Sequence, residues 1–486
     1  MVFNSLVFLV FFAVVYAAYR ALPHRGQNWL LLVSSYVFYG WWDWRFAGLL
    51  AATSFGSWAS GLLIARCREK GNARGAWWAG FANIALNLGI LGFFKYWNFF
   101  AESFAALFGH FGLGLEPRLL GIVLPVGISF YTFQALSYSI DVYRGGLEPT
   151  RDWVDFFAFV AFFPQLVAGP IERAGHLLPQ MANPRTVTGE KVRSGAWLAI
   201  WGLFKKVVIA DNLSAMVDST YGAAGATGAM GLMATYAFAM QIYCDFSGYS
   251  DMARGLARMM GFDLMENFRL PYMAANPKEF WARWHVSLST WLKDYVYIPL
   301  GGNRRGARRQ TANLFATMLL GGLWHGAAWT FVAWGAWHGA LLAGWHAWAR
   351  GHGGVKRFTG GGSLAADVQQ ESGGGRWLRV RRIVMFHLVC LGWVFFRAGS
   401  FAEAWNVISG TFTRWAWDVR AANMATALVL LCWPLWAVQA VQAKAGSREV
   451  VGKLSLVPRT ALYLAMALMF AWLANTGGGA FIYFQF

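Results

Sequence analysis

Apolar segments long enough to cross a bilayer recur along nearly the whole chain, and they constrain its fold more than any other feature. A transmembrane helix needs about 17–25 predominantly apolar residues to cross about 30 Å of hydrocarbon. Of the 486 residues, 57% are hydrophobic and only 13% are charged, whereas a soluble domain has about 25% charged residues. The sequence therefore predicts an all-α polytopic membrane protein.

The predicted spans are distributed from one end of the chain to the other. Glycine, proline and polar residues at membrane depth are tolerated only where they are buried in protein or line a cavity, and they cluster at 124–134, 162–173 and 244–255. Segments 281–300 and 311–348 are less regular than the others. We expect spans near 5–22, 28–42, 46–65, 77–98, 120–140, 153–170, 195–216, 229–256, 383–397, 423–441 and 460–476.

The net charge of +18 could indicate a nucleic-acid partner, but the basic residues form no continuous face. They gather in short loops at 66–74, 304–309, 356–382 and 444–459. This is the positive-inside pattern of a membrane protein, so we expect a lipid bilayer as the surroundings and no nucleic acid. The first basic residues follow the first apolar run, which indicates a first span with an external N-terminus rather than a cleaved signal.

The remaining organisation is simple. Residues 351–375 are rich in glycine and serine and predict a flexible cytoplasmic loop. No repeat or second soluble domain is visible, so one membrane domain accounts for residues 1–486. The four cysteines form no CxxC pair, and we expect neither a disulfide nor a zinc site.

Three of the nine histidines lie in a stretch, 310–349, that contains no Asp, Glu, Lys or Arg. The basic loops on either side should both be cytoplasmic. This stretch must therefore enter the membrane and return to the cytoplasmic side, as two short spans or as a broken re-entrant hairpin. Gly321, Gly322 and Gly326 should loosen the helix around His325 and place it well inside the membrane or at the turn.

A shared metal cannot explain all three histidines. His338 and His346 would lie about 12 Å apart along one helix, whereas ligands lie about 2 Å from a metal ion. Haem ligated from separate helices stays open, although no spacing supports it. We expect His338 and His346 to hydrogen-bond to neighbouring helices. An ionisable residue inside a membrane is by default a functional hypothesis, and His325, flanked by Trp324 and Trp329, is the strongest candidate.

A second set of polar and aromatic residues occurs in "NPKEFWARWHVSLSTWLKDYVYIPLGGNRRG", residues 276–306. Its mixture of charges and tryptophans is typical of an amphipathic helix on the membrane surface. His285 interrupts this pattern beside Trp284. Taken alone, His285 is more easily explained by structure than by chemistry.

Several blocks together resemble the membrane-bound O-acyltransferases, and within them the bacterial alginate O-acetyltransferase branch. They are "PVGISFYTFQALSYSIDVYRG", "FFPQLVAGPIER", "DFSGYSDMARGLARMMGF", "NFRLPY", "EFWARWHVSLSTWLKDYVYIPLGG", "TMLLGGLWHGAAWTFVAWGAWHG" and "FIYFQF". The resemblance implies a ring of about 11 or more tilted transmembrane helices, with re-entrant segments, around a tunnel. It places His325 at the catalytic position and His285 at a second, polar active-site position.

The resemblance implies an O-acetyltransferase of the bacterial inner membrane. The basic clusters, assigned to the cytoplasm, predict that both termini face the periplasm. The enzyme's donor would be cytoplasmic acetyl-CoA, with no permanently bound cofactor and no metal. His325 would act as general base or as nucleophile, and His285 would orient the donor or polarise its carbonyl. Trp324, Trp329, Arg304 and Arg305 are candidate donor-binding residues, although topology alone explains the two arginines.

The acceptor stays open. The resemblance implies an exported polysaccharide such as alginate, reached through a periplasmic acetyltransferase partner, but related members acetylate peptidoglycan or cellulose or transfer D-alanyl groups. A transporter or polysaccharide channel without covalent chemistry is the alternative from another class. Such proteins have two related halves or intramembrane charges along a path, and the sequence shows neither.

Overall fold

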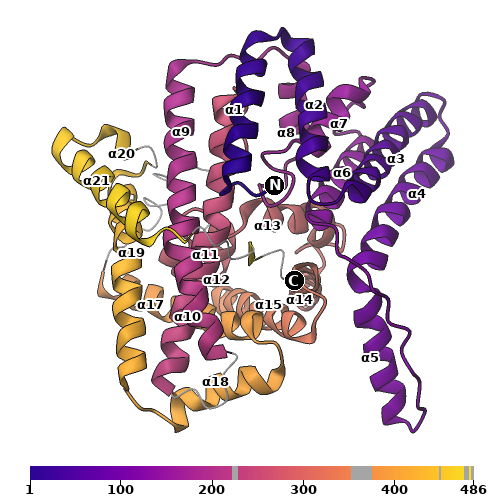
Figure 1. Cartoon of the computed structure of the whole chain (residues 1–486). Helices are drawn as coiled ribbons and strands as arrows, with labels where there is room; N and C mark the ends of the chain where they lie inside the picture. The colour runs from indigo at the N-terminus through magenta and orange to yellow at the C-terminus, as the bar shows by residue number, and fades with distance from the viewer. Residues whose placement is uncertain (222–227, 352–374, 448–449, 476–480, 483–486) are drawn as a thin grey trace. The chain divides into compact units, whose positions relative to one another are not determined.

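The computed structural model describes residues 1–221, 228–351, 375–447, 450–475 and 481–482 (Figure 1). Within these ranges every regular element is a helix and no strand occurs, which confirms the all-α prediction. The predicted loop 351–375 lies, apart from its two end residues, outside the described residues.

The chain divides into two compact units. The first contains Met1–Ala199 with Met252–Met265, and the second contains Ile200–Asp251 with Glu266–Phe486. Two long helices, α9 and α11, have residues in both units. That the whole chain is one domain stays a prediction.

The helices of the first unit are connected mostly by short turns. In order they are α1 (Leu6–Ala21), α2 (His24–Gly40), α3 (Trp44–Glu69), α4 (Ala73–Leu91), the π-helix η1 (Gly92–Tyr96), α5 (Trp97–His110), α6 (Ile128–Arg144), α7 (Trp153–Ala161), α8 (Ala174–Ala182) and the start of α9 (Gly189–Phe204).

The second unit begins within α9 and contains both candidate histidines. Its elements are the π-helix η2 (Lys205–Ala210), α10 (Asp211–Tyr221), α11 (Gly228–Met259), the 3-10 helix η3 (Pro271–Met273), α12 (Pro277–Arg283), α13 (Val286–Leu292), the π-helix η4 (Lys293–Tyr297), α14 (Gly306–His325), α15 (Trp329–Gly351), α17 (Arg376–Arg397), α18 (Phe401–Thr413), α19 (Val419–Ala445), α20 (Val450–Lys453) and α21 (Leu456–Leu473).

Most predicted spans coincide with helices, and two do not. The segment predicted at 120–140 becomes helical only at Ile128, and that predicted at 153–170 is helical only to Ala161. Both exceptions lie in the segments where glycine, proline and polar residues cluster. Among the described helices, α3, the continuous helix Ala73–His110, α19 and α21 are long and apolar enough to cross a membrane by length and composition.

Small polar residues join three helices of the first unit. Asn83 on α4 donates from Nδ2 to Ser139 Oγ on α6 at 2.7 Å, and Ser57 Oγ on α3 lies 3.2 Å from Asn83 Oδ1. Asn87, one turn along α4, donates to Asn83 Oδ1 at 2.9 Å. Because buried polar groups are costly unless they are hydrogen-bonded, this network specifies how α3, α4 and α6 pack.

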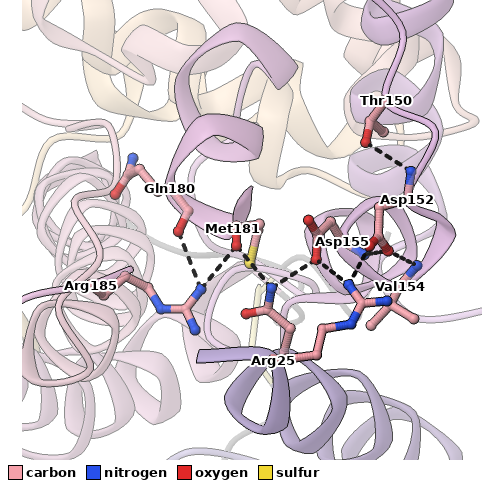
Figure 2. Close-up of polar contacts among 9 residues, drawn as sticks. Arg25, Thr150, Asp152, Val154, Asp155, Gln180, Met181 and Arg185 are labelled. Atoms are coloured by element: carbon pink, nitrogen blue, oxygen red, sulfur yellow. Dashed lines mark hydrogen bonds and ion pairs between the residues drawn. The ribbon is translucent and has the colours of Figure 1, made fainter. Parts of the chain in front are cut away.

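Charged residues join other parts of the same unit. Figure 2 shows Arg25 beside both Asp152 and Asp155, and Arg185 beside the main-chain carbonyls of Gln180 and Met181. Asn28 Nδ2 lies 2.7 Å from Asp155 Oδ1 and 2.8 Å from the carbonyl of Met181. These bonds link α2, α7 and α8 where the chain enters and leaves the helices.

The helices α14 and α15 form a tight hairpin in the second unit, and Figure 1 shows them side by side. A Cβ atom on Gly322 would lie 2.2 Å from the carbonyl oxygen of Phe331, so only glycine permits this approach. The hairpin predicted for 311–348 is confirmed, and its path into and out of the membrane stays a prediction. The expected loosening at Gly321 and Gly322 is wrong, because both lie in regular helix and the chain leaves α14 only after His325.

Candidate active site

His325 is the last residue of α14, at the turn of the hairpin, and its side chain is buried. The next residue, Gly326, has an extended backbone. A Cβ atom at position 326 would lie 2.1 Å from the ring of Phe331, so Phe331 occupies the space that any larger residue would need. The absence of a side chain at Gly326 lets the chain turn directly after His325.

His285 lies in the two-residue break between α12 and α13 and is fully buried. Its backbone is left-handed, with φ 43° and ψ 54°. A non-glycine residue in this conformation costs on the order of 1–3 kcal/mol and persists only when its surroundings hold it. Strain of this kind is concentrated at functional sites, and His285 is one of two described non-glycine residues with positive φ.

The two imidazoles come from separate segments of the chain and lie close together. Their ring centroids are 6.3 Å apart, with the planes at 58°. A bound atom can hydrogen-bond to each of two partners at about 2.6–3.2 Å. One reacting group between the rings could therefore contact both.

Aromatic side chains enclose the pair. His325 is in edge contact with Trp324, Trp334 and Phe396, at centroid distances of 5.0, 5.0 and 5.2 Å. His285 contacts Phe246 at 4.6 Å and Trp324 at 5.7 Å. Trp324 thus touches both histidines. Such an enclosure keeps water from a reactive acyl group and strengthens electrostatic interactions inside the site.

Two buried lysines form ion pairs elsewhere in the same unit. Lys206 Nζ lies 2.8 Å from Asp211 Oδ1 and 2.7 Å from Asp245 Oδ1, and Lys205 Nζ lies 2.6 Å from Asp251 Oδ2. Asp245 Oδ2 also accepts a hydrogen bond from the amide of Ile482 at 2.7 Å. These pairs join η2, α10, α11 and the end of the chain.

Sequence reasoning missed this ion-pair network. The lysine pair at 205–206 inside a predicted span, together with the aspartates of 244–255, was the available signal. Buried charges are stable only when they are paired. Positive charges in one predicted span and negative charges in another therefore indicated that the two spans are in contact.

Segment 276–306 is not a surface helix, which corrects the amphipathic interpretation. It is divided into α12, α13 and η4, and Arg283, Trp284 and His285 are at most 1% exposed. The Arg283 guanidinium pairs with Glu279 at 2.6 Å. In the sequence these charges resemble the exposed face of a surface helix, but they form an ion pair inside the protein.

His338 also differs from expectation. It is fully buried on α15, between Phe280, Trp281 and Trp334. Neither of its ring nitrogens has a hydrogen-bond partner within the described residues, so the expected bonds to neighbouring helices are not made there. Its ring is instead stacked on Phe280, with the planes at 10°.

The four candidate donor-binding residues are not brought together. Trp324 is buried beside both histidines, whereas Trp329 is 55% exposed at the start of α15. Arg304 and Arg305 are exposed just before α14. The 20-residue helix α14 places them about 30 Å along its axis from His325. No cluster of His, Cys, Asp and Glu in the described part of the chain could hold a metal ion.

Several residues around the histidines were not singled out in the sequence, notably Phe246, Trp334 and Phe396. Trp334 occurs in the same charge-free stretch as His325. Its position across the expected hairpin turn was the only sequence signal that it lies near His325. Phe246 and Phe396 come from distant helices, and no local pattern marks them.

Comparison with known proteins shows the family of the chain. Residues 150–350 match the model of the membrane-bound O-acyltransferase family. The chain is 43% identical over 428 residues to a probable alginate O-acetylase of Azotobacter vinelandii, covering 87% of this chain and 81% of that protein. It is 34% identical to a peptidoglycan O-acetyltransferase of Helicobacter pylori (84% and 79% covered) and 29% identical to a teichoic acid D-alanyltransferase of Streptococcus thermophilus (52% and 65% covered).

The names of these relatives share acyl transfer, two of them to an oxygen atom, but differ in the acyl group and in the acceptor that they state. The transporter alternative has no support among them. The chain therefore belongs to the membrane-bound O-acyltransferase family, and it is a membrane-embedded O-acyltransferase.

Proposed function

We propose that this protein takes acetyl groups from cytoplasmic acetyl-CoA and passes them across the bacterial inner membrane for O-acetylation of an exported polysaccharide. The observation that carries the proposal is the juxtaposition of His285 and His325, 6.3 Å apart between ring centroids, within an aromatic enclosure. The names of the most similar relatives support acetyl as the acyl group and alginate as the polymer.

In the proposed reaction His325 takes the proton from the acceptor hydroxyl. The hydroxyl oxygen attacks the thioester carbonyl carbon, the carbon–sulfur bond breaks, and the departing thiolate recovers the proton from the imidazolium. In the other version a nitrogen of His325 attacks the thioester carbonyl carbon, the carbon–sulfur bond breaks, and the thiolate leaves with the imidazole proton. The hydroxyl oxygen then displaces the imidazole from the acetyl group, and the hydroxyl proton passes to the imidazole. A burst of CoA release without any acceptor, equal in amount to the enzyme, separates the two, because only the second version breaks the carbon–sulfur bond before the hydroxyl attacks.

His285 has a supporting role in both versions. A neutral imidazole that donates a hydrogen bond to the thioester carbonyl stabilises the negative charge that develops on its oxygen, and removal of one such donor costs about 10²–10³-fold in rate. Trp324, which touches both rings, would then keep the two imidazoles apart by a constant distance.

We further propose that a periplasmic acetyltransferase partner receives the acetyl group before the polymer does. An acceptor between two buried imidazoles must be narrow, such as a side-chain hydroxyl or a small carrier, and a polysaccharide chain is bulky. Both chain termini would face the periplasm, since the basic loops at 66–74 and 444–459 are assigned to the cytoplasm. Cysteine labelling from each side of the membrane tests this orientation.

Reconstitution in liposomes tests the whole proposal. Labelled acetyl-CoA is supplied on the cytoplasmic side and alginate on the other, with or without a periplasmic acetyltransferase from the same organism. We expect His325-dependent release of CoA, and acetylated alginate only when the partner is present. Efficient glycan acetylation without the partner would refute the relay, and CoA release unaffected by His325→Ala would refute the enzyme mechanism.

Teichoic acid and peptidoglycan relatives define the second candidate, in which the acyl group is D-alanyl or the polymer is peptidoglycan. Supplying a D-alanyl thioester or peptidoglycan fragments in the same liposomes compares these directly. The higher identity to alginate O-acetylases, 43% against 34%, favours the alginate assignment.

A further inference from the structure

The strained backbone at His285 is held from outside its own helices. On one side, the amide of Arg269 donates to the carbonyl of Arg283 at 2.9 Å, and on the other, the amide of Val286 donates to the carbonyl of Asn267 at 3.0 Å. The segment 267–269 therefore pairs with 283–286 across the left-handed residue.

The side chain of Asn267 adds a third support. It is 1% exposed, and its Oδ1 accepts a hydrogen bond from the amide of Ser287 at 3.3 Å. Its Nδ2 donates to Ser250 Oγ on α11 at 3.1 Å. One carboxamide thus connects the first turn of α13 to a different, long helix.

The helix α11 supports His285 at two points on one face. Ser250 holds Asn267, and Phe246, four residues earlier, packs its ring against the His285 imidazole at 4.6 Å. Residues four apart in a helix lie on the same side. The same surface of α11 therefore supports both the backbone of the turn at His285 and its imidazole.

We propose that Asn267 is a positioning residue, which holds the left-handed turn at His285 so that its imidazole faces the group bound at His325. It does not touch the reacting atoms. The proposal rests on the proposed function for its effect on rate, but the geometry it describes can be measured without activity. Asn267 is the first residue of the segment "NFRLPY".

Kinetics test the effect on the reaction. Since misplacement of a catalytic group by about 1 Å can cost about 100-fold, we expect Asn267→Ala to lower the rate of acetyl transfer by about 10- to 100-fold. In a His285→Ala background the same substitution should change the rate little further, because its effect passes through His285. Ser250→Ala, a smaller change, should give a smaller loss in the same direction.

The matched control is Asn87→Ala, which removes an equally buried asparagine of the first unit. It should leave the rate near that of the wild type. Full activity in a folded Asn267→Ala protein overturns the proposal. A double variant whose loss of rate equals the product of the losses of Asn267→Ala and His285→Ala also overturns it. If Asn267→Ala does not fold, the rate of acetyl transfer in Ser250→Ala is the test. Full activity of that variant overturns the proposal that Asn267 is held in place by α11.

Hydrogen exchange tests the geometry whatever the protein catalyses. Asn267→Ala should accelerate amide exchange in the peptide containing Val286 and Ser287, and Asn87→Ala should not. Unchanged exchange in that peptide overturns the proposal even if the enzyme is active. Faster exchange together with a wild-type protein that cleaves no acetyl-CoA would instead contradict only the proposed function.

Discussion

Trp334 lies edge-on against His325, with the ring centroids 5.0 Å apart and the planes at 86°. Trp334 is 1% exposed and also contacts His338, with the ring centroids 4.9 Å apart. Trp334 therefore brings α15 into contact with the candidate base on α14.

Removal of Trp334 should admit water to His325. Trp334→Ala is expected to lower acetyl transfer while raising the ratio of acetyl-CoA hydrolysis to transfer, and to destabilise the protein by about 3–5 kcal/mol. Trp334→Phe keeps a ring at the contact and should preserve the wild-type ratio. Release of CoA with and without an acceptor measures both reactions, and an unchanged ratio in Trp334→Ala would contradict the shielding role.

His325→Ala should abolish acetyl transfer, with a loss of at least about 10²–10⁴-fold, and leave the detergent-extracted size profile intact. His285→Ala should also impair transfer strongly. His346→Ala serves as the control, since His346 is only partly buried on α15. Labelled acetyl-CoA assays on purified variants rank the three, and an inactive but stable His346→Ala beside a silent His285→Ala would reverse the assignment.

His338→Phe should keep activity and raise the melting temperature. Neither ring nitrogen of His338 is bonded in the described structure, and replacing an unsatisfied buried polar group with an apolar one of similar shape is neutral or stabilising. Phenylalanine also preserves the stacking on Phe280. Thermal unfolding and transfer assays test this, and lost activity at normal stability would show that the imidazole nitrogens bind something during the reaction.

Gly326→Ala should displace His325, because the added methyl group would lie 2.1 Å from the Phe331 ring. We expect a strong loss of transfer and a lower melting temperature. A second substitution, Phe331→Leu, shortens the obstructing side chain and should restore part of both. Without any recovery in the double variant, the clash with Phe331 would not be the cause.

His176 predicts a pH effect in the first unit. Its hydrogen bond to the buried carboxylate of Glu172, at 2.8 Å, raises the pKa of His176 above 6.5. A raised histidine pKa stabilises the fold below the unfolded value of about 6.5, and this stabilisation is lost as the pH rises through the folded value. The melting-temperature advantage of the wild type over His176→Gln should therefore be larger at about pH 6 than at about pH 9.

The control for His176 is His110→Gln, which removes an exposed histidine at the end of α5. Its melting temperature should differ from that of the wild type by a similar amount at both pH values. A His176→Gln difference that grows with pH would have the wrong sign for the proposed pair.

The sequence predicted features that depend on local periodicity. Helices, their approximate bounds and the hairpin around His325 follow from apolar segments and flanking charges. That His285 and His325 belong to one site was predicted from the family resemblance alone. The two residues are 40 positions apart in the chain, with several turns between them, and no spacing rule covers that separation. Burial of Arg283 and Glu279 was predicted wrongly, because two charges that pair inside a protein look the same in sequence as two that face water.

The uninterrupted helix α14 begins directly after Arg304 and Arg305 and ends at His325. One inserted or deleted residue anywhere inside it would rotate His325 by about 100° and shift it by about 1.5 Å along the axis, relative to these two arginines. Substitutions on its outer face change only what the helix touches. The position of His325 therefore depends on the number of residues in segment 306–325 more than on which residues they are.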